Sequence, residues 1–168
     1  MQRAEHRVRA ADTRDLEAIN DIYNAYVTES HVTFDATPLT MDQRSAWFRE
    51  HADPRHVVLV AVVDDAIAGY ATSGRHRPRV GYETTVETSA YVAPTHVGRG
   101  VGTSLYTALF DALAGKDLHR ALAGIAQPNE ASVALHRRFG FRRVARFTEQ
   151  GRKFGRYWDV DWYERALD

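Results

Sequence analysis

The chain of 168 residues has no cysteine, no net charge and no long apolar run. Without cysteine it can form neither a disulfide nor a thiol nucleophile. Its 22 Lys and Arg residues balance 22 Asp and Glu residues, so the chain as a whole gives nucleic acid no broad electrostatic reason to bind. No apolar run approaches the ~20 residues of a membrane span, and Met1–His6 holds no hydrophobic signal region. We therefore expect a cytoplasmic protein that binds neither nucleic acid nor membranes.

The length and an apolar content of 44% predict one domain, residues 1–168, with a sizeable core. Strand-like and amphipathic helical segments alternate without a repeat or linker, which indicates an α/β domain with a mixed sheet. Strands are predicted over 6–10, 56–63, 67–73, 84–92, 120–126, 141–147 and 157–163, with a turn-rich segment at 150–155. Helices are predicted over 12–28, 40–51, 103–114 and 129–139, with Thr40 and Gln43 as a capping box and Asn129 as a further cap.

The most informative stretch is ETSAYVAPTHVGRGVG, residues 87–102, which predicts a strand, a glycine loop and a helix start. Gly98, Gly100 and Gly102 stand at every second position before the helix. The first amides of a helix lack intrahelical partners and carry partial positive charge, so such a loop suits a phosphate or pyrophosphate. A tight turn explains the glycines equally well. The Lys of a P-loop and the third glycine of the dinucleotide fingerprint are both missing.

The loop spacing resembles the pyrophosphate loop of the GNAT superfamily, the acetyl-coenzyme A-dependent N-acetyltransferases. Segments 87–92, 102–106, 128–136 and 140–141 are similar to its phosphinothricin acetyltransferase branch, and the resemblance covers residues 8–162. It implies the GNAT fold, which is a mixed, mostly antiparallel sheet of about seven strands, splayed at the cofactor site and flanked by about four helices. It also implies acetyl-coenzyme A as co-substrate and no metal.

The resemblance implies that the loop amides bind the pyrophosphate and that the pantetheine arm pairs with strand 84–92 as an extra strand. The family usually has Gln or Arg where Val97 stands, and Arg99 can compensate. For Asn129, a plain helix cap is the alternative to a donor contact. The residues expected to bind the donor are Ala90, Tyr91, Val92, Val97, Gly98, Arg99, Gly100, Val101, Gly102, Thr103 and Asn129.

Two residues are expected to be catalytic. Glu87 is the only acid in its strand and shares a face with Ser89 and Tyr91 by alternation. The resemblance makes Glu87 the general base that deprotonates the amine, directly or through water, and a solvated or salt-bridged glutamate is the alternative. His136 stands where the wider superfamily often has a Tyr acting as acid to the thiolate. Contact with substrate, or a histidine held by its helix neighbours, is the alternative there. A backbone N–H near Tyr91 is expected to polarise the thioester carbonyl.

The loop at residues 74–82 precedes the Glu87 strand, and the resemblance implies that it lines the acceptor pocket together with residues 33–34. The expected acceptor-binding residues are Phe34, Arg75, Arg77, Arg79 and Tyr82. Arginines favour an anionic head group, although a solvated loop explains them as well. The predicted reaction is acetylation of the amine of phosphinothricin, methionine sulfoximine, methionine sulfone or a related amino acid. The alternatives are acetylation of a protein N-terminus or lysine, and a coenzyme A-binding module without catalysis.

The branch also implies a homodimer with the C-terminal strands near the partner, although core packing explains their aromatic residues equally well. Those aromatic residues are Phe154, Tyr157, Trp158, Trp162 and Tyr163. Lys153 and Arg156 are further candidates for the acceptor pocket. A proline separates His51 from His56 in the sequence, and no His-Glu-x-x-His motif occurs. We therefore expect no metal site.

Overall fold

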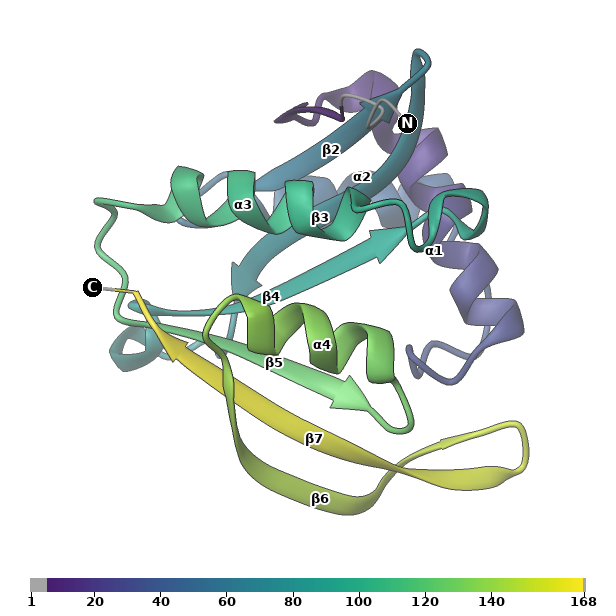
Figure 1. Ribbon diagram of the computed structural model, residues 1–168, viewed down its shortest axis with the longest axis vertical. Coiled ribbons are helices and arrows are strands. Elements are labelled where there is room, and N and C mark those ends of the chain that lie inside the picture. Colours follow the sequence, from purple (N-terminus) through teal and green to yellow (C-terminus); the bar gives the residue numbers. More distant parts are fainter. Residues whose placement is uncertain (1–5, 168) are drawn as a thin grey trace.

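Seven strands form one open sheet in the computed structural model, which describes residues 6–167 (Figure 1). The strands are β1 (Arg7–Ala10), β2 (Val58–Val63), β3 (Ala66–Arg75), β4 (Thr85–Val92), β5 (Arg120–Ala126), β6 (Arg142–Lys153) and β7 (Arg156–Ala166). The helices are α1 (Leu16–Glu29), α2 (Met41–Arg49), α3 (Val101–Leu113) and α4 (Glu130–Arg138), with 3₁₀ turns η1 (Thr13–Asp15), η2 (Val80–Tyr82) and η3 (Pro94–His96). The predicted signal-free N-terminus and the outer domain limits involve residues 1–5 and 168, which lie outside the described part.

The strands lie side by side in the order β1-β2-β3-β4-β5-β7-β6. Within residues 6–167, β4 and β5 form the single parallel pair and all other neighbours are antiparallel. This arrangement confirms the predicted mixed, mostly antiparallel sheet flanked by four helices. Because β4 and β5 are parallel, the connection between them crosses the sheet, and it does so through the glycine loop and α3.

The helices cover both faces of the sheet, and each face has its own apolar cluster (Figure 1). On one face α3 buries Leu105 and Leu109 completely against β2, β3 and β4. On the other face α1 packs Ile19 against Val60 and Tyr70. All six residues of β2 are buried, so β2 reads as the continuous apolar run expected of a central strand.

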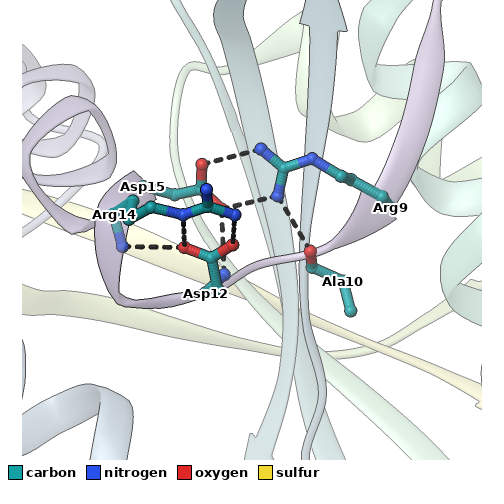
Figure 2. Close-up of polar contacts among 5 residues, drawn as sticks. All are labelled: Arg9, Ala10, Asp12, Arg14 and Asp15. Carbon is teal, nitrogen blue, oxygen red and sulfur yellow. Dashed lines mark hydrogen bonds and ion pairs between the residues drawn. The ribbon is translucent and has the colours of Figure 1, made fainter.

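The helix starts follow their local sequence. Thr40 and Gln43 form the predicted capping box, with Gln43 N–H donating to Thr40 Oγ1 at 3.2 Å and Thr40 N–H to Gln43 Oε1 at 2.9 Å. Figure 2 shows the turn that precedes α1, where Arg9 of β1 donates to both carboxylate oxygens of Asp15 at 2.7 and 2.8 Å. The hydrogen bond from Arg9 lowers the pKa of Asp15. This pair ties β1 to the turn that opens α1.

The sheet splits between β4 and β5, as the resemblance to the GNAT superfamily implied. Their pairing runs from Thr85 opposite Arg120 to Glu87 opposite Leu122 and ends there. Figure 1 shows the two strands diverging toward their carboxyl ends. Meanwhile β4 stays paired with β3 as far as Val92, so only one edge of β4 is exposed by the split.

Several predicted boundaries were wrong, among them the start of α3 and the ends of β3 and β6. Helix α3 begins at Val101 and not at Thr103, because Gly100 in the left-handed region already ends the loop. Strand β3 continues through Gly74 to Arg75, where the sequence predicted loop. Strand β6 continues to Lys153, whereas a turn-rich break over 150–155 was expected; the turn itself contains only 154–155. A register shift between Phe147 and Gly151 absorbs the irregular residues, so pairing with β7 resumes after them.

Candidate active site

Two cavities meet on the sheet where β4 and β5 separate. One, which we call the Glu87 cavity, has a volume of about 1030 Å³, and the other, which we call the glycine-loop cavity, has about 660 Å³. Both are lined by Thr88, Ser89 and Tyr91 of β4 and by Gly124 and Ala126 of β5. A molecule bound in one cavity can therefore touch a molecule bound in the other across the split sheet.

The glycine-loop cavity lies over the first turn of α3. Gly98 and Gly100 have φ of +78° and +86°, a conformation that favours glycine. No side chain caps the helix start, so the amides that follow Gly100 keep their donors for another partner. Every residue expected to bind the donor lines this cavity except Arg99, which is exposed outside it.

The exposed edge of β4 borders the same cavity. Ala93 N–H donates to Ala68 of β3 at 2.8 Å, so by alternation the backbone groups of Ala90 and Val92 face the split. The carbonyl of Val92 accepts a hydrogen bond from the Tyr26 hydroxyl at 2.6 Å. An extended arm in the split would thus meet the amide and carbonyl of Ala90 and the amide of Val92.

Asn129 stands at the start of α4, on the opposite wall. Its Oδ1 accepts from the Ser132 amide at 3.2 Å, so it caps the helix, and it also lines the glycine-loop cavity. The two roles proposed from the sequence are therefore compatible in space.

His136 lies on α4 at the edge of this cavity with both ring nitrogens engaged. Its Nδ1 is 2.7 Å from the Ser132 carbonyl, and its Nε2 is 2.9 Å from the Tyr106 hydroxyl. A carbonyl only accepts, so Nδ1 carries the proton and Tyr106 donates to Nε2. Burial lowers the pKa of His136, so the ring is neutral at neutral pH.

The Glu87 cavity receives the side chains of Glu87, Ser89 and Tyr91 from one face of β4, in line with the predicted alternation. Glu87 keeps 41% of its side chain exposed, and its Oε1 lies 2.6 Å from Nδ1 of His76. His76 lies in the loop at residues 74–82, and the sequence indicated no role for it. Its nearness to Glu87 follows from the register that pairs Gly74 with Glu87, which no local motif reveals.

The expected acceptor residues divide into two groups. Phe34, Arg75 and Tyr82 line the Glu87 cavity, whereas Arg77 and Arg79 do not. Arg77 lies 5.7 Å from the Tyr82 ring and donates to His76, and Arg79 is exposed just before η2. Of the three arginines, only Arg75 is thus placed to meet an acceptor in this cavity.

One wall of the Glu87 cavity, which we call the outer wall, carries titratable groups of both signs that the sequence did not predict to line an acceptor pocket. They are Glu50, His51, Asp53, Arg55, His56 and Glu83. Arg55 is tied to Asp53 at 2.7 Å and lies 3.9 Å from Glu83. Burial lowers the pKa of His51 and of His56. These residues sit in loops without a motif, so only the fold brings them together.

The β6–β7 hairpin holds the loop that carries Phe34. Lys153 is buried and donates from Nζ to the Thr33 carbonyl at 2.8 Å. The Phe34 ring rests on Gly151, where any Cβ would overlap it. Trp158 stacks on His31 with ring centroids 4.0 Å apart. Lys153 thus supports the loop that carries Phe34 and does not line the Glu87 cavity.

The C-terminal aromatic residues are split between the core and the surface. Tyr163 is 2% exposed and packs in the core, and Trp162 lies across Gly124 in the Glu87 cavity. Phe154 and Tyr157 are exposed at the hairpin end.

The described residues contain neither a candidate membrane-spanning helix nor a candidate metal-binding cluster. Over residues 6–167, no helix is long and apolar enough to cross a membrane. In the same range, no three His, Asp or Glu residues are grouped so that they could hold a metal ion.

Known proteins match this chain over nearly its whole length. The family model described as "Acetyltransferase (GNAT) domain" matches residues 8–162. A phosphinothricin N-acetyltransferase of Streptomyces coelicolor is 53% identical, with 98% of both chains covered. An L-methionine sulfoximine/L-methionine sulfone acetyltransferase of Pseudomonas paraeruginosa is 37% identical, with 96% of this chain and 94% of that one covered. The structure of a putative acetyltransferase from Salmonella typhimurium with its cofactor acetyl-CoA has a TM-score of 0.92 at 35% identity, covering 97% of this chain and 94% of that one.

Proposed function

Since the chain belongs to the GNAT acetyltransferase family and is an acetyl-coenzyme A-dependent N-acetyltransferase, we propose that it acetylates the amine of a small amino-acid-like acceptor. Phosphinothricin, methionine sulfoximine and methionine sulfone are the acceptors we propose first, because relatives that match this chain end to end are named for them. The reaction is direct transfer, with Glu87 as general base.

One observation carries this proposal. The glycine-loop cavity and the Glu87 cavity open onto the same stretch of β4, at the point where β5 leaves it. A donor in one and an acceptor in the other would bring two reactants together on a rigid strand, which removes much of the entropic cost of their encounter.

The residues around the glycine-loop cavity fit acetyl-coenzyme A. The uncapped start of α3 suits its pyrophosphate, and the positive φ of Gly98 and Gly100 keeps Cβ atoms away from those amides. The backbone of Ala90 and Val92 suits its amide-containing arm. When bound, acetyl-coenzyme A supplies an activated acetyl thioester. Of the two amides near this point, that of Tyr91 lies on the side of β4 paired with β3 and that of Val92 faces the split, so the Val92 N–H is our candidate for polarising its carbonyl.

Glu87 has the placement that a base requires. An alkyl amine is mostly protonated at neutral pH, so the attacking nitrogen must first lose a proton. Glu87 projects from the shared strand into the larger cavity and keeps contact with solvent, so the proton can pass to it directly or through a water. Both ring nitrogens of His136 are engaged in hydrogen bonds. This favours a structural role for His136 over a role as the acid that protonates the leaving thiolate. A thiol of pKa ~8.5 leaves readily as an anion, so an acid is little needed.

The walls of the Glu87 cavity suit a zwitterion. Arg75 offers a guanidinium for a carboxylate or phosphinate, and the acidic residues of the outer wall favour an ammonium group. Phe34 and Tyr82 add partly exposed apolar surface for a short side chain.

We also propose a homodimer and a cytoplasmic location. Val144 and Phe147 on β6, with Phe154 and Tyr157 at the hairpin end, are large exposed apolar side chains on an outer edge of the sheet, which supports association through this region. Acetyl-coenzyme A is a metabolite of the cell interior, which supports the location.

The test is release of free thiol from acetyl-coenzyme A against a panel of acceptors. The panel holds the three acceptors above, the common amino acids, polyamines and short peptides. We expect one of the first three, or a related amino acid, to give kcat/KM near 10⁴ M⁻¹s⁻¹ or above, which is about the lower end for enzymes with their own substrates. Turnover with peptides alone would overturn the proposed acceptor class and favour acetylation of a protein N-terminus or lysine.

A further inference from the structure

We propose that His76, held in one tautomer by Glu87 and Arg77 together, positions the Glu87 carboxylate for its task as base. The inference rests on the proposed function, because it concerns the same carboxylate. It gives His76 a role, and it gives Arg77 a different role from the acceptor contact expected from the sequence.

The contact between His76 and Glu87 is short and partly sheltered. Nδ1 of His76 lies 2.6 Å from Oε1 of Glu87, and the His76 side chain is 13% exposed against 41% for Glu87. Because β3 pairs Gly74 with Glu87, the residue just beyond the end of β3 lies next to the carboxylate. The ring therefore stands behind Glu87, and the carboxylate faces the cavity.

Glu87 and Arg77 together decide which nitrogen of His76 carries the proton, because the carboxylate at Nδ1 only accepts and the guanidinium at Nε2 only donates. Nε of Arg77 lies 3.3 Å from Nε2 of His76 and donates to it. A guanidinium can only donate, so Nε2 must offer its lone pair and the proton of a neutral ring stays on Nδ1. That proton points at Oε1 of Glu87. The sequence of hydrogen bonds thus runs in one direction, from Arg77 through His76 to Glu87.

Tyr82 fixes the ring in place from the other side. The 3₁₀ turn η2 brings Tyr82 back over the loop, with its ring 5.7 Å from that of His76 and at 82° to it. The guanidinium of Arg77 lies 5.7 Å from the same Tyr82 ring. The side chains of His76 and Arg77 are therefore both held by Tyr82 before any substrate binds.

The consequence for Glu87 is a single preferred carboxylate orientation. A glutamate side chain that is free in solvent samples several rotamers, and restricting it costs conformational entropy. Here Oε1 is bound to His76, so Oε2 is the oxygen that meets the amine or a bridging water. Small displacements of a reacting group can lower a rate by about 10²-fold, so this orientation matters for kcat.

The first test compares His76→Asn, His76→Gln and His76→Phe with the parent enzyme. The amide nitrogen of Asn can replace Nδ1, whereas that of Gln reaches the place of Nε2. We expect His76→Asn to keep kcat within about threefold, and His76→Gln and His76→Phe to lose about tenfold or more, with the KM for acetyl-coenzyme A unchanged in all three. A full kcat in His76→Phe, or an equal loss in His76→Asn and His76→Phe at equal thermal stability, would overturn the proposal.

The second test reads the tautomer without turnover. Nitrogen-15 NMR of histidine-labelled protein should show His76 protonated at Nδ1, and Arg77→Met should weaken that preference, because Glu87 alone then holds it. Arg137→Met, which removes an exposed charge from α4 outside both cavities, is the matched control and should leave the signal unchanged. A signal from His76 protonated at Nε2 in the parent protein would overturn the proposal.

A further variant, Glu87→Gln, separates this inference from the proposed function. If Glu87→Gln kept full activity, Glu87 would not be the base and the proposed mechanism would fail, whatever the NMR signal of His76. If Glu87→Gln were inactive while His76→Phe were fully active, the mechanism would stand and the role of His76 would fall.

Discussion

The Tyr106 hydroxyl donates to Nε2 of His136 across 2.9 Å, and both side chains are buried between α3 and α4. Nδ1–H of the same ring donates to the Ser132 carbonyl. The pair therefore joins the helix that carries the glycine loop to the helix that forms the opposite wall of its cavity. Because both ring nitrogens already have protein partners, neither is free to give a proton to the thiolate of coenzyme A.

We predict that Tyr106→Phe will affect stability more than chemistry. The substitution leaves the buried Nε2 of His136 without its donor, which should lower the free energy of unfolding by about 1–3 kcal/mol. The loss in kcat should stay below the roughly 10²–10⁴-fold that general acid–base catalysis contributes. Urea unfolding and steady-state kinetics measure the two effects. Unchanged stability with a loss of kcat in that range would contradict this view.

The protein should lose stability as the pH falls below about 6.5, and His136 should account for part of the loss. Burial lowers the pKa of His136 from its usual 6.5, so the folded state binds a proton less readily than the unfolded state. The stabilisation is complete above pH 6.5 and is lost as the pH falls through the folded pKa. Asp12, Asp15 and Asp161 also have lowered pKa values, but from 3.8, so they act in a more acidic window.

Melting temperatures at pH 7.5 and 5.5 test this prediction. His136→Phe should melt lower than the parent at pH 7.5 but show a smaller drop between the two values. Burial also lowers the pKa of His51 and His56, so a residual drop should remain. An equal drop in parent and variant would mean that His136 does not contribute.

We predict that Gly151→Ala will weaken acceptor binding alone. A Cβ at Gly151 would overlap the Phe34 ring, so the Phe34 side chain must move from its position in the wall of the Glu87 cavity. The KM for the acceptor should rise while that for acetyl-coenzyme A stays the same. Gly81→Ala, which meets nothing within 4 Å, is the matched control and should change neither. An unchanged acceptor KM in Gly151→Ala would show that the position of Phe34 does not matter for binding.

A pair of glycine substitutions should separate donor binding from backbone strain. Gly98 and Gly115 have φ of +78° and +72°, and a Cβ at either meets nothing within 4 Å. Alanine should therefore cost each site a similar ~1–2 kcal/mol of strain. Only Gly98 lines the glycine-loop cavity, so only Gly98→Ala should weaken coenzyme A binding measured by calorimetry. Equal affinities in the two variants would argue against the loop as the pyrophosphate site.

Much of the fold could be predicted because its signals are local. The capping box at Thr40 and the cap at Asn129 depend on residues three positions apart, and both are present in the structure. The β5 limits, Arg120–Ala126, were predicted to the residue because a short apolar segment is bounded by polar ones. The end of β6 was not predicted, because Gln150 and Gly151 have the composition of a turn. Only pairing with β7 makes them part of the strand.

The residues that line the glycine-loop cavity were also easier to predict than those that line the Glu87 cavity. The glycine loop and the strand before it are continuous in sequence, so their residues come together by chain connectivity. The Glu87 cavity collects residues from the segment after α1, the end of β3 and the C-terminal hairpin. Arg77 illustrates the difficulty, because its position near the pocket was foreseen but its direction depends on His76 and Tyr82.

The most direct test of acetyl transfer across the β4–β5 split is kcat/KM of Glu87→Gln with the best acceptor of the panel, alongside its affinity for coenzyme A. Glutamine keeps the shape of the side chain and removes the base. Glu17→Gln, an equal change at an exposed site on α1, is the control and should behave like the parent. We predict that kcat/KM falls by about 10²–10⁴-fold in Glu87→Gln while coenzyme A affinity is unchanged. Activity within a few-fold of the parent would contradict the assignment of Glu87 as the base.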